Sequence, residues 1–589
     1  MNFLINTIIH PLLQILITFI LCSGILNIGK LINLKVFSNY DYYFFDLSLG
    51  AIILSQIIFI FFVFGYFNEI ISILSYVLIF FGITNLGLFK KIEFFFRAMS
   101  KNKIDYNIIL ISIIILSFAI ISLSPPTMAD ALDYHFGIPL YLINYFKLPN
   151  QDIWLHGSLF GNGELFNAIG LYLKSDNFFT FFQFLSLVFF FEFLRNNEKD
   201  NVKLKFIFFF IISSPVILFL ISGPKPLLFP QLLTTAALYI FIKEKKFNIK
   251  NIILIGILLM GAVQFKLSFV LSCAFLVLLV LIKSYQNHKK VIYYLILLSI
   301  FFFLPKAMYN FNQVSEFNLI NIFTTLPNDF LAMLSDYRDN SFIFPINLFI
   351  PNSFGAITTS LGFQLLLLVF IKKSTKEFNI IFIITFFTII LHFFLGQQTS
   401  RLYFEFLLWV SIGFLFLNKK YFNFKFFTYL LYPQLILVTT IALYFATLVL
   451  SSLISLNERD KFMNKNSFEY QAIKWSNNQI SSKDLIISEL RSNVFFKNEI
   501  IPLEVSEDML KLQKTSKYIK YLKEKKPNFI ISYKENFDNH FLKECIGSIY
   551  RSSDVFEKSS RNPFNRGEKY KIYIYHFNSD KLNYCANLN

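Results

Sequence analysis

Residues 105–142 have the sequence DYNIILISIIILSFAIISLSPPTMADALDYHFGIPLYL. The first half of this stretch is apolar over a length that can cross the hydrocarbon core of a bilayer as one helix. Pro125 and Pro126 end that helix, because proline has no backbone N–H and clashes with the preceding turn. Asp130 and Asp133 follow at once. The stretch therefore indicates a membrane protein that carries ionisable groups where a spanning helix leaves the bilayer.

The remainder of the chain has the same apolar character. Hydrophobic residues make up 55% of the 589 positions and charged residues 15%, whereas a soluble domain is charged at about 25% of its positions. We identify about fourteen runs long enough to span a bilayer as helices, whose backbone groups pair within the segment. They lie at 12–29, 46–67, 70–89, 105–124, 178–194, 205–222, 226–242, 251–265, 267–282, 291–305, 343–371, 379–395, 402–418 and 426–453. The sequence predicts a polytopic α-helical membrane protein with about 11–14 transmembrane helices.

The net charge of +17 comes from short basic clusters between the apolar runs. This pattern sets the orientation of a membrane protein, so we expect no nucleic-acid partner. The clusters are Lys90, Lys91, Arg97, Lys101 and Lys103 before the fourth run, and then Lys203 with Lys205, Lys243 to Lys246, Lys289 with Lys290, Lys372 with Lys373, and Lys419 with Lys420 in every second loop. These loops are predicted to be cytoplasmic, and the long, mildly acidic loops at 125–177 and 306–342 to face outward.

From about residue 455 the composition changes to that of a soluble domain. Asn, Lys, Glu and Ser become more frequent. Short apolar runs alternate with helical stretches, the pattern of a small α/β domain. The apolar runs lie at 485–488, 529–533 and 572–575, and the helical stretches at 468–478 and 508–524. The prediction is thus three parts: additional N-terminal helices at 1–103, a transmembrane core at 104–454, and an outward C-terminal domain at 455–589.

Two of the four cysteines, Cys545 and Cys585, lie in this C-terminal domain, whereas Cys22 and Cys273 lie in apolar runs. An outward domain is in an oxidising compartment, where disulfides persist. A Cys545–Cys585 disulfide is one interpretation, and two unrelated thiols are the other.

Candidate chemistry begins with Asp130, Asp133 and His135, which crowd the membrane surface. A low local dielectric raises the proton affinity of a carboxylate, and a general base benefits from a pKa near the working pH. Thr127 and Asp130 also have the spacing of a capping box, which predicts a second helix lying along the surface. Leu132, Phe136 and Leu140 of that helix are expected to rest on lipid or on the bundle. The alternative is that Asp130 only favours the dipole of this helix.

Further candidates lie in later outer segments. His156 and Glu164 stand among three glycines in a loop before the fifth run, where ordinary turn chemistry is the alternative. Lys225, Lys266 and Arg401 are isolated cations near outer helix ends. An ionisable group at membrane depth indicates function by default, although long basic side chains also extend harmlessly to the interface. Such cations suit a lipid phosphate, which arginine binds through paired donors.

These features resemble the polytopic glycosyltransferases of the GT-C fold, especially the bacterial relatives of protein mannosyltransferase and lipid A aminoarabinose transferase. Such enzymes carry an acidic motif in the first large outer loop after a spanning helix, the place of Asp130 and Asp133 here. Residues 156–164 are similar to their second loop motif, 261–268 to a lysine-containing helix start, and 397–403 to a late Arg-Tyr motif. An outward α/β tail also fits. The chain departs from the pattern at Ala131, where an Asp-Glu pair is usual, and in its additional N-terminal helices.

The resemblance implies transfer of a sugar from a polyprenyl-phosphate donor to an outer-face acceptor such as a lipid-linked glycan, lipopolysaccharide or protein. It implies an inverting enzyme of the bacterial cytoplasmic (inner) membrane, in contact with membrane lipids, whose C-terminal domain is extracytoplasmic. Asp130 would be the general base, supported by Asp133. The substrate-binding residues would be His135, His156, Glu164, Lys225, Lys266 and Arg401, with Lys266 and Arg401 on the donor phosphate. No HExxH-type metal signature is present, and Mg²⁺ or Mn²⁺ is left open as a cofactor.

Three other functions stay open at this point. A lipid or glycan transporter or flippase needs broken helices and polar sites near the bilayer midplane. A glycan polymerase or ligase of another membrane fold also uses outer-face arginines. A non-enzymatic scaffold would present only the C-terminal domain. The sequence does not identify the sugar or the acceptor.

Overall fold

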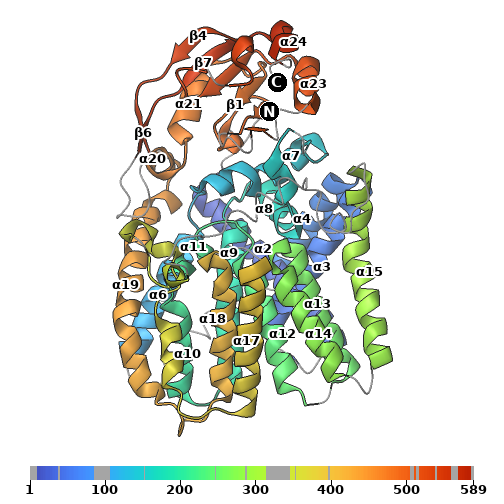
Figure 1. Cartoon of the computed structure of the whole chain (residues 1–589), viewed down its shortest axis with the longest axis vertical. Helices are drawn as coiled ribbons and strands as arrows, with labels where there is room; N and C mark the ends of the chain where they lie inside the picture. Colours follow the sequence, from blue (N-terminus) through green and yellow to red (C-terminus); the bar gives the residue numbers. More distant parts are fainter. Residues whose placement is uncertain are drawn as a thin grey trace.

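The computed structural model shows a bundle of helices with a small sheet domain at one end (Figure 1). It describes the chain except for residues 1–8, 38–39, 41, 85–105, 151–152, 246, 285–287, 314–344, 352, 396–397, 505–509, 512–515, 538–539, 559–567 and 586–589. Most of the predicted outer loop at 306–342 lies outside the described residues, including Glu316, Asp329, Asp336 and Asp339.

The bundle is built from helices that follow the apolar runs. They are α2 (Pro11–Val36), α3 (Tyr43–Val63), α4 (Phe67–Thr84), α6 (Tyr106–Ser122), α9 (Phe178–Asn197), α10 (Asn201–Ile212), α11 (Val216–Ile221), α12 (Leu228–Lys243), α13 (Ile249–Phe265), α14 (Val270–Lys283), α15 (His288–Gln313), α17 (Lys376–Leu395), α18 (Ser400–Phe416) and α19 (Phe424–Leu450). Within the described residues, seven helices are long and apolar enough to cross a membrane, and shorter apolar helices accompany them. The transmembrane character is confirmed.

Two predicted spans are wrong as single helices. The run at 343–371 contains three short 3₁₀ helices in its described part, η6 (Ile346–Leu348), η7 (Phe354–Thr359) and η8 (Gln364–Phe370). Prolines and Gly362, whose φ is +89°, break it. The run at 205–222 is divided into α10 and α11 at Ser213 to Pro215.

Side chains satisfy the backbone where these runs are broken. Gln434 of α19 donates to the carbonyl of Ser213 at 2.7 Å, and Ser214 donates through Oγ to the carbonyl of Leu361 at 2.7 Å. A broken run is tolerated inside a membrane protein only when buried partners replace the lost helical bonds. Apolarity alone therefore did not distinguish these segments from continuous spans.

The N-terminal helices α2, α3 and α4 pack through glycines. Gly29 lies so close to α3 that a Cβ placed on it would be 1.7 Å from the Asp46 carbonyl oxygen. A Cβ on Gly24 would be 2.2 Å from the Leu78 carbonyl oxygen of α4. Small residues permit such backbone contact between spanning helices.

The same N-terminal helices join the core through Gln56 of α3. Its amide nitrogen donates to the Phe301 carbonyl of α15 at 2.8 Å, and its Oε1 accepts from Asn162 at 3.0 Å. Asn162 begins α8 (Asn162–Tyr172). The helices added at the N-terminus thus support the segment that carries Glu164.

Three predicted cytoplasmic loops meet at one end of the bundle. Lys419 pairs with Asp200 at 2.8 Å, Lys243 donates to Asn197 at 3.0 Å, and Lys203 donates to the carbonyl of Leu415 at 2.5 Å. Figure 1 shows α7 (Gly137–Tyr145), α8 and the sheet domain at the other end. The basic loops therefore lie at the opposite end from residues 130–145, which contain Asp130 and Asp133 and are called the acidic segment below. This is what the charge pattern predicts.

The C-terminal domain contains the predicted strands. Its five-stranded sheet has the order β2-β1-β3-β7-β4, in which β1 is parallel to β2 and β3, while β7 is antiparallel to β3 and β4. The elements are α20 (Leu456–Asn466), α21 (Tyr470–Gln479), β1 (Ile486–Ser488), β2 (Ile500–Pro502), α23 (Ser516–Lys525), β3 (Phe529–Ser532), β4 (Ile546–Ser552), β5 (Phe556–Lys558), β6 (Glu568–Tyr570), β7 (Tyr573–Phe577) and α24 (Leu582–Cys585). The small sheet region is confirmed.

Cys545 of the C-terminal domain differs from the cysteines of the apolar runs. Cys545 is disulfide-bonded, whereas Cys22 and Cys273 are free and buried. The side chain of Cys585 lies outside the described residues.

The C-terminal domain docks on the acidic segment. Leu132, Phe136 and Leu140 share a buried apolar cluster with residues of this domain, among them Ile473, Leu490, Val494, Phe495 and Phe496. The expectation that these three side chains rest on lipid or on the bundle is therefore wrong, because the sheet domain covers them. A buried ion pair between Asp176, at the end of the outer loop at 125–177, and Arg459 of α20 also joins this loop to the C-terminal domain.

The close contact between Gly29 and the backbone of α3 predicts that a larger residue at position 29 lowers the stability of the protein. Gly29→Ala should lower the free energy of unfolding in detergent by about 1–3 kcal/mol, because the new methyl meets a backbone carbonyl that cannot move aside. Thermal unfolding measures this. Gly256→Ala is the matched control, since its Cβ would meet only the side-chain ends of Leu298 and Leu295. Equal stability of the two variants would contradict the assigned packing.

Candidate functional site

The sequence predicts a helix capped by Thr127 and Asp130 after the two prolines, and a helical segment does begin there. It starts at residues 129–130, passes through a single π turn, η1 (Ala131–His135), and continues as α7 from Gly137. Asp130 precedes the π turn and makes no side-chain cap hydrogen bond. Its carboxylate is used elsewhere, so the capping interpretation is wrong. Such π turns are rare and are frequent at functional sites.

Asp130 lies between two cations from distant parts of the chain. Lys225 Nζ is 3.1 Å from Oδ2, and Arg491 of the C-terminal domain is 2.9 Å from Oδ1. Burial raises the pKa of this carboxyl, but the charges of Lys225 and Arg491 outweigh burial and hold the pKa well below its usual range. The expectation of a raised pKa at Asp130 is wrong for this state, because the sequence did not show both partners.

Asp133 is buried and accepts from several donors. Trp154 Nε1 donates to Oδ1 at 2.9 Å, and His156 Nδ1 is 2.8 Å from Oδ2. Two residues of the C-terminal domain also reach it: Asn493 donates to Oδ1 at 3.3 Å, and Arg491 is 3.6 Å from Oδ2. This network fixes the orientation of Asp133.

His156 is held between two carboxylates. Burial lowers its pKa, but Asp133 and Glu504 outweigh burial and raise the pKa to about 9. Glu504 of the C-terminal domain lies 3.7 Å from Nδ1. His156 is therefore a cation at neutral pH.

His135 and Glu164 form a second buried pair. His135 Nδ1 is 2.7 Å from Glu164 Oε1, while Oε2 of Glu164 accepts from the backbone N–H of Gly161 at 2.7 Å. Burial lowers the pKa of His135 to about 4, so the imidazole is neutral. The pKa of Glu164 is lowered because Lys266 and His135 outweigh its burial. The ionised Glu164 accepts a hydrogen bond from Nδ1–H of His135. Nε2 of the neutral ring therefore carries no proton and is an acceptor, and it has no hydrogen-bond partner among the described residues.

Lys266 and Arg401 lie near Tyr134, and Lys225 interacts with Arg401. Lys266 lies 5.7 Å from the centre of the Tyr134 ring and 3.8 Å from Glu164. Arg401 is close enough to interact electrostatically with Tyr134 and Lys225, and its guanidinium lies 5.9 Å from the Phe219 ring. Burial, followed by the charge of Arg401, lowers the pKa of Lys225 to about 8. The site thus concentrates positive charge in a region with little water.

The eight residues predicted from the sequence therefore gather at one end of the bundle. Sequence reasoning missed Lys306 of α15, which interacts electrostatically with Glu164 and Lys266. The sequence did contain an indication of Lys306: it is an isolated cation that follows Pro305 at the end of an apolar run, much as Lys266 follows α13. Arg491, Asn493 and Glu504 were also missed. Nothing in the sequence placed the C-terminal domain against the acidic segment.

The site does not fit a divalent metal ion. Within the described ranges, no group of three or more His, Cys, Asp or Glu side chains is arranged to hold one. Asp130 and Asp133 instead face cations and N–H donors of the protein. No step is therefore assigned to Mg²⁺ or Mn²⁺.

Comparison with known proteins identifies one family. Residues 82–463 match the DUF1420 N-terminal domain. The match includes the acidic segment and the cations at 225, 266 and 401, and it ends before Arg491. No curated protein and no solved structure matches the chain. These comparisons give no support from a glycosyltransferase family.

The His156–Asp133 pair predicts a pH dependence of stability. The pKa of His156 is raised from 6.5 to about 9 in the folded chain. The pair therefore stabilises the fold fully below about pH 6.5 and loses this contribution as the pH rises through about 9. The melting temperature of wild type minus that of His156→Gln should fall across this window. Lys225 is present in both proteins, so its titration cancels in the difference between the two melting temperatures. Parallel plots of melting temperature against pH for wild type and His156→Gln would contradict the pairing.

Proposed function

We propose that this chain, which belongs to the DUF1420 family, is a membrane glycosyltransferase that uses a polyprenyl-phosphate sugar as donor. The observation that carries the proposal is the meeting of Asp130 and Asp133 with Lys225, Lys266 and Arg401, which come from separate helices and loops. Transfer from a lipid phosphate needs both kinds of group. A base takes the acceptor proton, and positive charge stabilises the departing phosphate.

The basic side chains are suited to the donor phosphate. Lys266 lies 5.7 Å from the Tyr134 ring, Arg401 interacts electrostatically with Tyr134 and Lys225, and the charge of Arg401 adds to burial in lowering the pKa of Lys225. An anion placed among them would relieve this repulsion. Arginine offers paired donors to phosphate, so Arg401 is assigned to the phosphate oxygens.

Asp130 is assigned as the general base, supported by Asp133. The acceptor hydroxyl loses its proton to Asp130 while its oxygen forms a bond to C1 of the donor sugar. The bond between C1 and the phosphate oxygen breaks, and polyprenyl phosphate leaves with the electron pair, so the sugar inverts. Because Lys225 and Arg491 hold the pKa of Asp130 low, a donor phosphate that draws Lys225 away would make Asp130 more basic.

The neutral imidazole of His135 is assigned to substrate orientation. Glu164 fixes its Nδ1 and leaves Nε2 to accept a hydrogen bond. His156, as a cation, holds Asp133 in place. We place the reaction on the outer face of the bacterial cytoplasmic membrane, with a lipid-linked glycan, lipopolysaccharide or protein as acceptor, because the basic loops at the opposite end favour a cytoplasmic location for that end.

Asp130→Asn should abolish sugar transfer, because the amide keeps the shape of the side chain but cannot take the proton. The measurement is incorporation of labelled sugar from a polyprenyl-phosphate donor pool into envelope acceptors, with the variants expressed in a deletion strain. Asp200→Asn, at the opposite end of the bundle, is the matched control and should retain transfer. Asp130→Glu should keep part of the activity, which separates loss of the base from misfolding. Full transfer by Asp130→Asn at equal protein levels would overturn the assignment.

Arg401 should act mainly on donor binding. Arg401→Ala is expected to raise the KM for the donor by about tenfold or more, since it removes a charge-assisted contact to phosphate. Arg401→Lys should restore part of this loss, because it returns the charge without the paired donors. Initial rates at varied donor concentration measure the effect. A change in the KM for acceptor alone would place Arg401 outside the donor site.

A further inference from the structure

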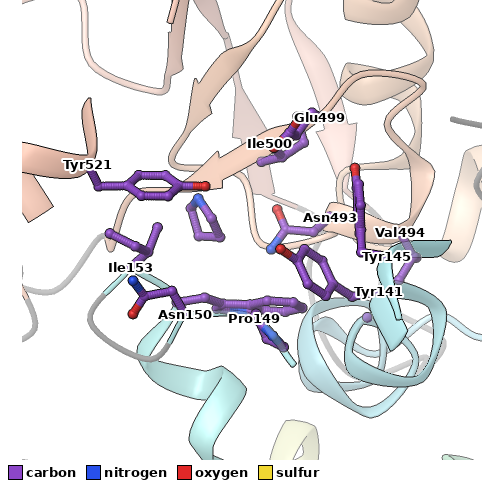
Figure 2. Close-up of a pocket in the computed structure, with 13 residues that line it drawn as sticks. Tyr141, Tyr145, Pro149, Asn150, Ile153, Asn493, Val494, Glu499, Ile500 and Tyr521 are labelled. Atoms are coloured by element: carbon purple, nitrogen blue, oxygen red, sulfur yellow. The ribbon is translucent and has the colours of Figure 1, made fainter. Parts of the chain in front are cut away.

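Trp154 and Asn493, which bind Asp133, also line a cavity. The cavity opens between α7 and the C-terminal domain, and its empty volume of about 570 Å³ includes space open to solvent. Figure 2 shows Tyr521, Glu499 and Ile500 on the side of the C-terminal domain, with Tyr141, Pro149 and Asn150 facing them from the other part of the chain. The cavity therefore exists only because the two parts are docked.

Aromatic rings form much of its surface. Tyr141, Tyr145, Trp154 and Tyr521 all line it. The rings of Tyr141 and Tyr145 have centroids 4.4 Å apart, and those of Tyr141 and Trp154 lie 6.4 Å apart. Flat apolar faces of this kind bind the C–H faces of sugar rings through burial and dispersion.

Polar groups are interspersed with these rings. Asn150, Asn493 and Glu499 line the same cavity. Glu499 is close enough to Tyr141, Tyr145 and Tyr521 to raise the pKa of each hydroxyl, in addition to the effect of burial. Amides, hydroxyls and a carboxylate together can donate to and accept from the hydroxyl groups of a sugar. None of the described residues that line the cavity is Lys, Arg or His, so this lining does not suit a phosphate.

Two residues that line the cavity also bind Asp133 of the proposed site. Trp154 donates to Asp133 at 2.9 Å and Asn493 donates at 3.3 Å, while both side chains also line the cavity. On the far side, Arg491 links Asp133 to Asp130 at distances of 3.6 and 2.9 Å. A molecule bound in the cavity would therefore be one side chain away from Asp133, and Asp133 and Arg491 would lie between it and the proposed base Asp130.

We propose that this cavity binds a saccharide ring, uncharged or carrying an amino group. Its role as the acceptor glycan rests on the proposed function, whereas saccharide binding itself does not. The separation of chemistries supports this assignment: cations around Tyr134 suit the donor phosphate, and rings with amides behind Asp133 suit a carbohydrate.

Binding can be measured without any donor. The full chain in detergent carries three tryptophans, and Trp409→Phe with Trp475→Phe leaves Trp154 as the only fluorescent indole. This protein is titrated with disaccharides of glucose, mannose, galactose, N-acetylglucosamine and glucosamine. At least one of them should change the Trp154 fluorescence saturably. Saturation-transfer NMR on the otherwise unmodified chain repeats the titration without the tryptophan substitutions.

Variants then locate the ligand. Tyr521→Ala should weaken binding by about tenfold, the scale of one lost aromatic contact, and Tyr521→Phe should retain it. Tyr584→Ala, an exposed tyrosine of the same domain, is the control and should bind as wild type does. No saturable signal from any of the saccharides by either method, or binding that Tyr521→Ala leaves unchanged, overturns the proposal.

Asp130→Asn distinguishes this inference from the proposed function. It should bind the saccharide normally and transfer no sugar. If wild type binds a saccharide through Tyr521 but transfers nothing, the glycosyltransferase proposal fails and the saccharide site stands. If transfer occurs and is unaffected by Tyr521→Ala while no saccharide binds, the reverse holds.

Discussion

Burial of Asp133 is the constraint on which the site depends. An ionised carboxylate removed from water is costly unless donors and cations replace the lost solvent. The fold supplies them from two places: Trp154 and His156 from the loop after α7, and Arg491 with Asn493 from the C-terminal domain. Because no single part of the chain contains all these partners, the buried carboxylate of Asp133 has its full set of donors only in the assembled protein. The C-terminal domain is therefore a structural part of the site.

Apolar contact holds that assembly together. Leu132 and Phe136, next to Asp133 in the chain, are buried against Leu490, Val494 and their neighbours in the C-terminal domain. Polar and apolar residues alternate over a few positions, so the same short segment binds the domain through one set of side chains and binds its cations through the other. The buried Asp176–Arg459 pair holds α20 of the C-terminal domain against the end of the outer loop at 125–177. Removing the apolar contact or the Asp176–Arg459 pair should lower the free energy of unfolding by more than that contact alone contributes, because the remaining ion pairs would become exposed to water.

The sequence predicted what depends on local pattern. Apolar length gave the spanning helices, alternation gave the strands around 485–488, 529–533 and 572–575, and isolated charges indicated Lys225, Lys266 and Arg401. It did not predict what depends on distant partners. The break in 343–371 requires Gln434 of another helix, and the low pKa of Asp130 requires Arg491, which is far away in the chain. A charge pattern gives the end of the bundle at which a residue lies, but the neighbour that sets its pKa comes from tertiary packing.

The ion pairs of Asp130 bear on how a site of this kind avoids wasteful chemistry. A base held between Lys225 and Arg491 is weak, and it becomes stronger only when something competes for those cations. An anionic lipid phosphate is such a competitor, and water is not. Under the proposed function, the acceptor would be deprotonated only when the donor is bound. The C-terminal domain contributes Arg491 to this arrangement and also the far wall of the aromatic cavity, so one docking event both restrains the base and forms the place for the sugar that it would activate.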